Sequence, residues 1–123
     1  MDTRAQPVTK PGVSQQAKRV GMVIGIKPDQ IEAYKDLHAG PGVRDLLRQA
    51  NIHNFSIYLR QLDDGRYYEF AYYEYIGADY AADMDWLSAQ PAYQAWLALC
   101  DPMQIPLVGE SSWAEMTEIY YNE

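Results

Sequence analysis

Residues 52–75 read Ile52-His-Asn-Phe-Ser-Ile-Tyr-Leu-Arg-Gln-Leu62, then Asp63-Asp-Gly-Arg66, then Tyr67-Tyr-Glu-Phe-Ala-Tyr-Tyr-Glu-Tyr75. Alternate side chains of an extended segment fall on opposite faces. In the first segment Phe55, Ile57 and Leu59 oppose Asn54, Ser56, Tyr58 and Arg60; in the second, Tyr68, Phe70 and Tyr72 oppose Glu69, Ala71 and Tyr73. The intervening Asp-Asp-Gly-Arg supplies the glycine that tight hairpin turns favour. The stretch therefore predicts an antiparallel hairpin with strands over 52–62 and 67–75.

One strand and two helical pieces are expected before the hairpin. From Arg19 onward, large apolar residues at alternate positions up to Ile26 predict a strand with one buried face. Pro28 and Asp29 then favour the first turn of a helix. Proline lacks an amide donor and restricts the residue before it, so Gly40-Pro41-Gly42 ends that helix. A second helical piece is predicted over 43–50.

The chain after the hairpin predicts two helices and a last strand. A helical pattern covers about 79–89, and Pro91 begins a further helix that runs to about Cys100. Two prolines and a glycine within 101–111 predict a loop. Alternation then predicts a final strand from Trp113 to Tyr121.

The order strand, helix, strand, strand, helix, strand predicts a ferredoxin-like α+β fold, an antiparallel sheet with helices on one face. The other face carries too many tyrosines and apolar groups to be left in water. A homodimer that stacks two such sheets face to face would cover it. Residues 19–123 are expected to form this single domain. Residues 1–18, rich in Gln, Pro, Ser and Thr, are expected to be a disordered leader.

The charge and composition of the chain indicate which classes of partner and which compartment to expect. Ten Lys and Arg against 17 Asp and Glu give a net charge of −7, which disfavours nucleic acid and anionic membranes as partners. The chain has no run of about 18 apolar residues that would span a bilayer, and its start lacks the apolar core of a secretory signal. The single Cys100 rules out an internal disulfide and fits a reducing compartment. We therefore expect a cytoplasmic protein.

Tyr34 and His38 are the first candidates for a functional site. Residues four apart on a helix share one face, so a phenol and an imidazole can reach the same cavity. Histidine is suited to moving protons near neutral pH, although at a helix end it can simply complement the dipole. Cys100 follows an apolar run and is expected to be a packed thiol. His38 and His53 have no carboxylate or thiolate at ligand spacing, so no metal is expected.

Four pieces of the chain carry a family resemblance. They are Tyr34-x-x-x-His38, Asn51-Ile-His-Asn-Phe-Ser-Ile-Tyr-Leu59, Gln94-Ala-Trp-Leu97 and Trp113-Ala-Glu-Met-Thr-Glu-Ile-Tyr120. In their order and spacing the chain resembles the L-rhamnose mutarotase family. The resemblance implies a dimeric α/β barrel that interconverts the α and β anomers of L-rhamnose, or of a related 6-deoxyhexose, without a cofactor. It also implies that His38 is the proton donor and that Tyr34, Phe55, Trp96 and Leu97 contact the sugar.

Other roles and functions stay open beside that one. Trp113, like Trp96, is expected to stack on the sugar ring or to pack in the core. Phe55 stands where the family has a tyrosine, and the segment Ala39–Gly42 is shortened and lacks the family's tryptophan. These departures favour a first alternative, a non-catalytic small-molecule-binding protein on the same dimeric barrel. A second alternative, by analogy of fold alone, is a heme-free monooxygenase.

Overall fold

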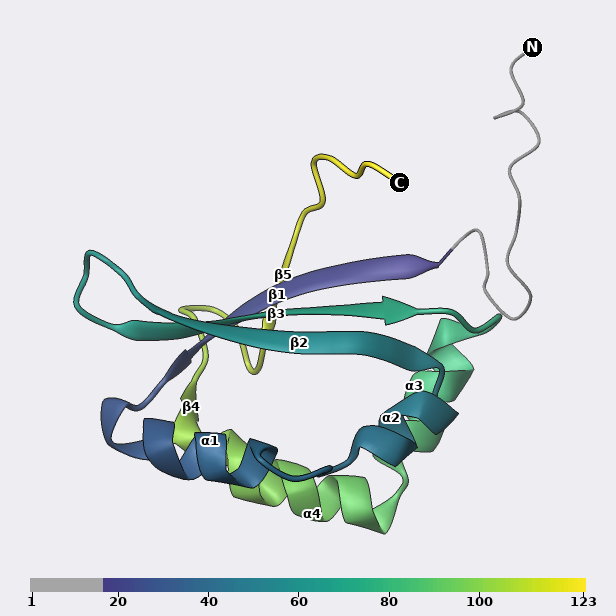
Figure 1. Ribbon diagram of the computed structural model, residues 1–123, viewed down its shortest axis with the longest axis horizontal. Helices are drawn as coiled ribbons and strands as arrows, with labels where there is room; N and C mark the ends of the chain where they lie inside the picture. The colour runs from purple at the N-terminus through teal and green to yellow at the C-terminus, as the bar shows by residue number, and fades with distance from the viewer. Residues whose placement is uncertain (1–16) are drawn as a thin grey trace.

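The computed structural model describes residues 17–123, which form one antiparallel sheet, four α-helices and two short 3-10 helices, Pro28–Gln30 and Asp101–Met103 (Figure 1). In chain order the elements are β1 (Lys18–Ile26), α1 (Ile31–His38), α2 (Arg44–Gln49), β2 (Ile52–Gln61), β3 (Tyr67–Tyr75), α3 (Tyr80–Ser88), α4 (Pro91–Cys100), β4 (Gln104–Ile105) and β5 (Ala114–Met116). The leader predicted over 1–18 lies outside the described residues except at its end, where Lys18 already belongs to β1. None of these helices is long and apolar enough to cross a membrane.

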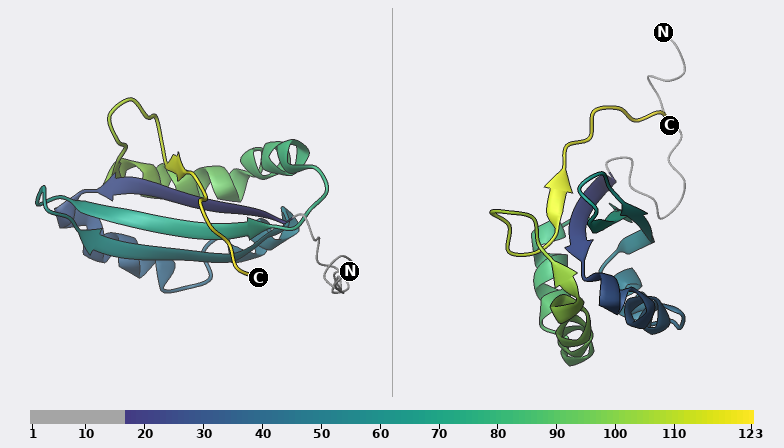
Figure 2. Two further views of the ribbon diagram at one scale, coloured as in Figure 1. Left: turned by 90° about the horizontal axis from the view of Figure 1, so that it is seen from above. Right: turned by 90° about the vertical axis from the view of Figure 1, so that its left-hand side faces the viewer.

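The sheet has the strand order β2-β3-β1-β4, with β5 also paired to β1, and every pairing is antiparallel. All four helices lie against one face of this curled sheet, and the other face is bare of helices (Figures 1 and 2). The order and the one-sided helices confirm the predicted ferredoxin-like α+β fold. The hairpin is also confirmed, with β2 ending one residue earlier than predicted, at Gln61.

The prediction for the end of the chain was wrong. A strand was expected over 113–121 and a loop over 101–111, but the ladder of β5 contains only Ala114–Met116, and β4 lies inside the predicted loop. The free edge of β1 is divided between two short strands, because Pro106 has no amide to donate and ends β4 at Ile105. After β5 the chain leaves the sheet (Figure 1).

A β-bulge at Asn54 sets which side chains of β2 face the helices. Asn54 has a φ of 53°, and the register with β3 shifts between His53 and Ser56. The Asn54 side chain donates a hydrogen bond of 2.7 Å to Glu74 on β3. One extra residue in a strand moves each side chain after it to the opposite face of the sheet. Ile52 before the bulge and Phe55 after it therefore both line the helix side of the sheet.

The core is split into two apolar clusters beneath the sheet. One is built around Val20, Ile52 and Leu87, and the other around Ile26, Tyr34 and Cys100. Burial of apolar surface stabilises each cluster by about 25 cal/mol per Å² removed from water. Between the clusters the sheet and the helices enclose a cavity.

Candidate functional site

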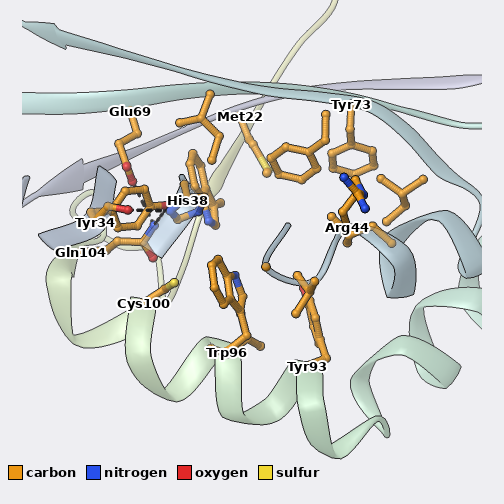
Figure 3. Close-up of a pocket in the computed structure, with 18 of the residues that line it drawn as sticks. Met22, Tyr34, His38, Arg44, Glu69, Tyr73, Tyr93, Trp96, Cys100 and Gln104 are labelled. Carbon is orange, nitrogen blue, oxygen red and sulfur yellow. Dashed lines mark hydrogen bonds between the residues drawn. The ribbon is translucent and has the colours of Figure 1, made fainter. Parts of the chain in front are cut away.

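The cavity has a volume of about 1180 Å³ and lies between the sheet and helices α1, α2, α3 and α4 (Figure 3). Small-molecule sites are typically about 300–1,000 Å³, so a monosaccharide fits with room to spare. All the site residues predicted from sequence line this one cavity: Tyr34, His38, Phe55, Trp96, Leu97 and Trp113. The fold thus brings together residues that are far apart in the sequence, from Tyr34 to Trp113.

His38 is the last residue of α1, and its ring is held on three sides. Its Nδ1 lies 2.7 Å from the backbone carbonyl of Tyr34. Because a carbonyl oxygen only accepts, Nδ1 must carry the hydrogen, which leaves Nε2 to exchange a proton with a ligand. The Tyr34 ring stacks on the imidazole at 4.3 Å, and the Trp96 indole meets it edge-on at 5.0 Å.

The segment Ala39–Gly42, which was predicted to end the helix, also forms part of the cavity wall. Gly42 has a φ of 53°, a conformation that side chains other than glycine's rarely adopt. A Cβ at this position would lie 2.9 Å from Cη2 of Trp96. Gly42 therefore lets the backbone pack directly on the indole, which is held between this segment and His38.

A buried acid lies at the same end of the cavity. Glu69 on β3 is only 2% exposed, and Gln104 on β4 is 9% exposed. The Gln104 side-chain amide donates to Glu69 Oε1 at 3.0 Å and to the Tyr34 hydroxyl at 3.2 Å. Burial raises the pKa of Glu69 to about 7, although the hydrogen bonds from Gln104 and Tyr34 oppose that rise. Burial also raises the pKa of Tyr34, so its phenol stays neutral and acts as a hydrogen-bonding group.

The sequence reasoning missed both Glu69 and Gln104 as members of the site. A signal for Glu69 was present, because alternation put this acid on the same strand face as Ala71 and Tyr73, and both of those are buried. A lone acid on an apolar strand face is unusual enough to indicate a function. Gln104 gave no such signal, since its segment was predicted to be a loop.

The remaining sequence candidates fall at other parts of the cavity or in the core. Phe55 stacks on Tyr73 at 5.5 Å with an angle of 12° between the rings. Tyr73 lies at the end of the cavity where Arg44 is found (Figure 3). Cys100 is buried, and burial raises its pKa to about 11, which keeps it a neutral thiol. His53 lies on β2 opposite Glu74. Within residues 17–123 no three His, Cys, Asp or Glu side chains are grouped so as to hold a metal ion.

This arrangement supplies the groups that proton transfer on a small polar ligand needs. One imidazole nitrogen is available for acid–base work, a carboxyl titrates near neutral pH, and a neutral phenol lies between them. The Trp96 ring offers an apolar surface of the kind on which sugar rings stack.

Comparison with known protein families and solved structures identifies proteins that this chain resembles. A family model described as L-rhamnose mutarotase matches residues 19–122. The crystal structure of an L-rhamnose mutarotase from Formosa agariphila has a similar fold, with a TM-score of 0.63 and 18% identity over 86% of this chain and 99% of that one. A putative antibiotic biosynthesis monooxygenase from Nitrosomonas europaea is also similar, with a TM-score of 0.51 and 19% identity over 84% of this chain and 100% of that one. At these identities the two structures show the fold alone. No protein of curated function matches the sequence significantly.

Proposed function

Because this chain belongs to the L-rhamnose mutarotase family, we propose that it interconverts the α and β anomers of L-rhamnose or of a related 6-deoxyhexose. The observation that carries the proposal is His38, held between Tyr34 and Trp96 with Nε2 free, in a cavity large enough for the sugar. Mutarotation consists of proton transfers, the breaking and re-forming of the bond from C1 to the ring oxygen, and a rotation, so the proposal includes no cofactor.

We assign the proton donor role to His38. In the protonated imidazole Nε2–H gives its proton to the ring oxygen of the sugar as the bond from C1 to that oxygen breaks, and the anomeric hydroxyl loses its proton as C1 becomes an aldehyde. Rotation about C1–C2 and reclosure with the transfers reversed give the other anomer. Such acid–base groups contribute about 10²- to 10⁴-fold each. Tyr34 and Phe55 contact the sugar, Trp96 and Trp113 stack on its ring, and Leu97 borders it.

The proposal includes the compartment and the assembly expected from the sequence. The lone, buried thiol of Cys100 fits the reducing cytoplasm. Pairing of two copies through the helix-free face of the sheet would complete a dimeric α/β barrel, since that face carries exposed aromatic groups such as Tyr58.

The proposal is tested by adding the protein to L-rhamnose at equilibrium and measuring anomer exchange by NMR saturation transfer. We expect exchange faster than in buffer alone, and we expect His38→Gln to lose about 10²-fold or more. His53→Gln is the comparison variant, because it removes the other histidine, which lines the same cavity from β2. A loss as large as that of His38→Gln would contradict the role assigned to His38. No acceleration for L-rhamnose or several other 6-deoxyhexoses, together with sugar binding in calorimetry, would establish the non-catalytic alternative instead.

A further inference from the structure

Glu69 is the one charged side chain on a strand face that otherwise carries apolar and aromatic groups. Its neighbours on that face of β3 are Ala71, Tyr73 and Tyr75, all buried. Among residues 17–123, no Lys, Arg or His forms an ion pair with it. An ionised carboxylate buried without a cation costs several kcal/mol. A neutral side chain of the same size would fill this space at lower cost, so packing gives no reason for an acid here.

Hydrogen bonds and ring stacking join Glu69 to His38 through two side chains. Gln104 donates from one amide nitrogen to both Glu69 and the Tyr34 hydroxyl. The Tyr34 ring in turn stacks on the His38 ring. Figure 3 shows Glu69 descending from the sheet toward Tyr34 and Gln104, with His38 beside them, while Arg44 lies at the opposite end. Glu69 and His38 therefore border the same end of one cavity, and they approach it from the sheet and from α1 respectively.

Ring opening of a hemiacetal needs two groups, because one oxygen gains a proton while the other loses one. The proposed function assigns the donor to His38 and leaves the acceptor without a residue. We infer that Glu69 is that acceptor: its carboxylate takes the proton of the anomeric hydroxyl while His38 protonates the ring oxygen. The C1–ring oxygen bond breaks, a C1 carbonyl forms, and on reclosure both protons return. This inference rests on the proposed function and adds the second catalytic residue to it.

The surroundings of Glu69 suit a base that works near neutral pH. A carboxylate has about four acceptor positions, so the hydrogen bonds from Gln104 and Tyr34 leave capacity for a substrate hydroxyl. Burial holds its pKa at about 7, which matches a proton acceptor to neutral conditions. The titratable groups that line the cavity together with Glu69 come from α1, α2, β2, β3, α4 and the turn after α4; they are Tyr34, Lys35, His38, Arg44, Arg48, His53, Tyr73, Tyr93, Cys100 and Asp101.

The test compares the wild-type protein with Glu69→Gln, which keeps the shape and removes the proton acceptor. In the saturation-transfer assay we expect kcat to fall about 10²-fold or more with a much smaller change in KM. The acidic limb of the wild-type rate profile should reflect ionisation of Glu69, whose pKa is about 7, and the variant should lack that limb. Glu32→Gln changes an exposed carboxylate on α1 and serves as the control that keeps both the rate and the profile.

A second variant, Gln104→Leu, tests the role of Glu69 without replacing Glu69 itself. Loss of the amide donor removes a hydrogen bond that lowers the pKa of Glu69, so the rising limb of the rate profile should move to higher pH. A limb that stays in place in Gln104→Leu, or a Glu69→Gln protein with the wild-type rate and profile, overturns the inference while the mutarotase function stands. A wild-type protein without exchange activity overturns both.

Discussion

Gly42 illustrates how a single residue without a side chain shapes the site. Its φ of 53° and its contact with the Trp96 indole both exclude a Cβ. We expect Gly42→Ala to lower the free energy of unfolding by about 1–2 kcal/mol from the backbone alone, measured by urea denaturation. Displacement of Trp96 should also raise KM in the anomer-exchange assay.

Gly40→Ala is the matched control for that prediction. Gly40 lies two residues earlier in the same segment, and a Cβ there would meet no atom within 4 Å. This variant should keep both stability and KM. Equal losses in the two variants would mean that the contact of Gly42 with Trp96 has no special importance.

Glu69 makes stability depend on pH in a direction opposite to that of an ion-paired acid. In the unfolded chain its pKa is near 4.5 and in the folded protein about 7. Well below pH 4.5 the carboxyl is neutral in both states and does not change the free energy of unfolding. As pH rises to about 7 only the unfolded state ionises freely, so the free energy of unfolding falls by up to about 3 kcal/mol, and the loss is complete above that pH.

Glu69→Gln should remove this loss. We expect the variant to gain stability over the wild type as pH rises from 4.5 to about 7, with no further gain above it, in urea titrations at several pH values. A stability difference that is flat with pH would contradict the raised pKa of Glu69. The same variant is expected to lose activity, so stability and catalysis make opposite demands on this residue.

At the scale of single elements, the bulge in β2 determines which side of the sheet Phe55 faces. Asn54 adopts a positive φ, which asparagine tolerates better than β-branched residues do. We expect Asn54→Gly to retain the bulge, and Asn54→Val to lose about 1–3 kcal/mol of stability. Hydrogen exchange of the β2 amides should report the loss locally, with faster exchange around residues 53–56.

Ser56→Val is the control for the bulge, because Ser56 is paired regularly with Tyr72 and valine suits a strand. It should exchange as slowly as the wild type. If Asn54→Val exchanged equally slowly, the bulge would not depend on the residue at its centre.

The elements also show what sequence can predict in this chain. The hairpin of β2 and β3 was predictable because its alternation and its glycine turn are local signals. The existence of β4 and the short length of β5 were not, because both depend on how the two strands share the edge of β1, a tertiary property that no local pattern encodes. The candidate site also combines local and tertiary features. Tyr34 and His38 were predicted from their spacing on a helix, whereas Gln104 contacts Tyr34 only because the sheet brings the two together.

At the scale of the whole molecule, the helix-free face of the sheet is the surface through which we propose that two copies pair. Tyr58 on β2 is 66% exposed on that face, paired with Phe70 on β3. The chain after β5 crosses the same side (Figure 2), anchored where Arg19 donates to Glu118 at 2.7 and 2.9 Å and stacks on Tyr121 at 3.5 Å. Aromatic groups gathered over a sheet face are typical of surfaces that a partner covers.

If two copies cover this face mutually, the protein should sediment as a dimer of its 14.1 kDa chain at micromolar concentration. Tyr58→Glu should then shift it toward the monomer, because each two-fold interface would bury two uncompensated charges. Val108→Glu is the control, since Val108 is fully exposed in the loop between β4 and β5. A wild-type protein that sediments as a monomer would contradict the dimer. If the dimer forms and Tyr58→Glu leaves it intact, the two copies meet elsewhere, and the helix-free face must be explained by another partner.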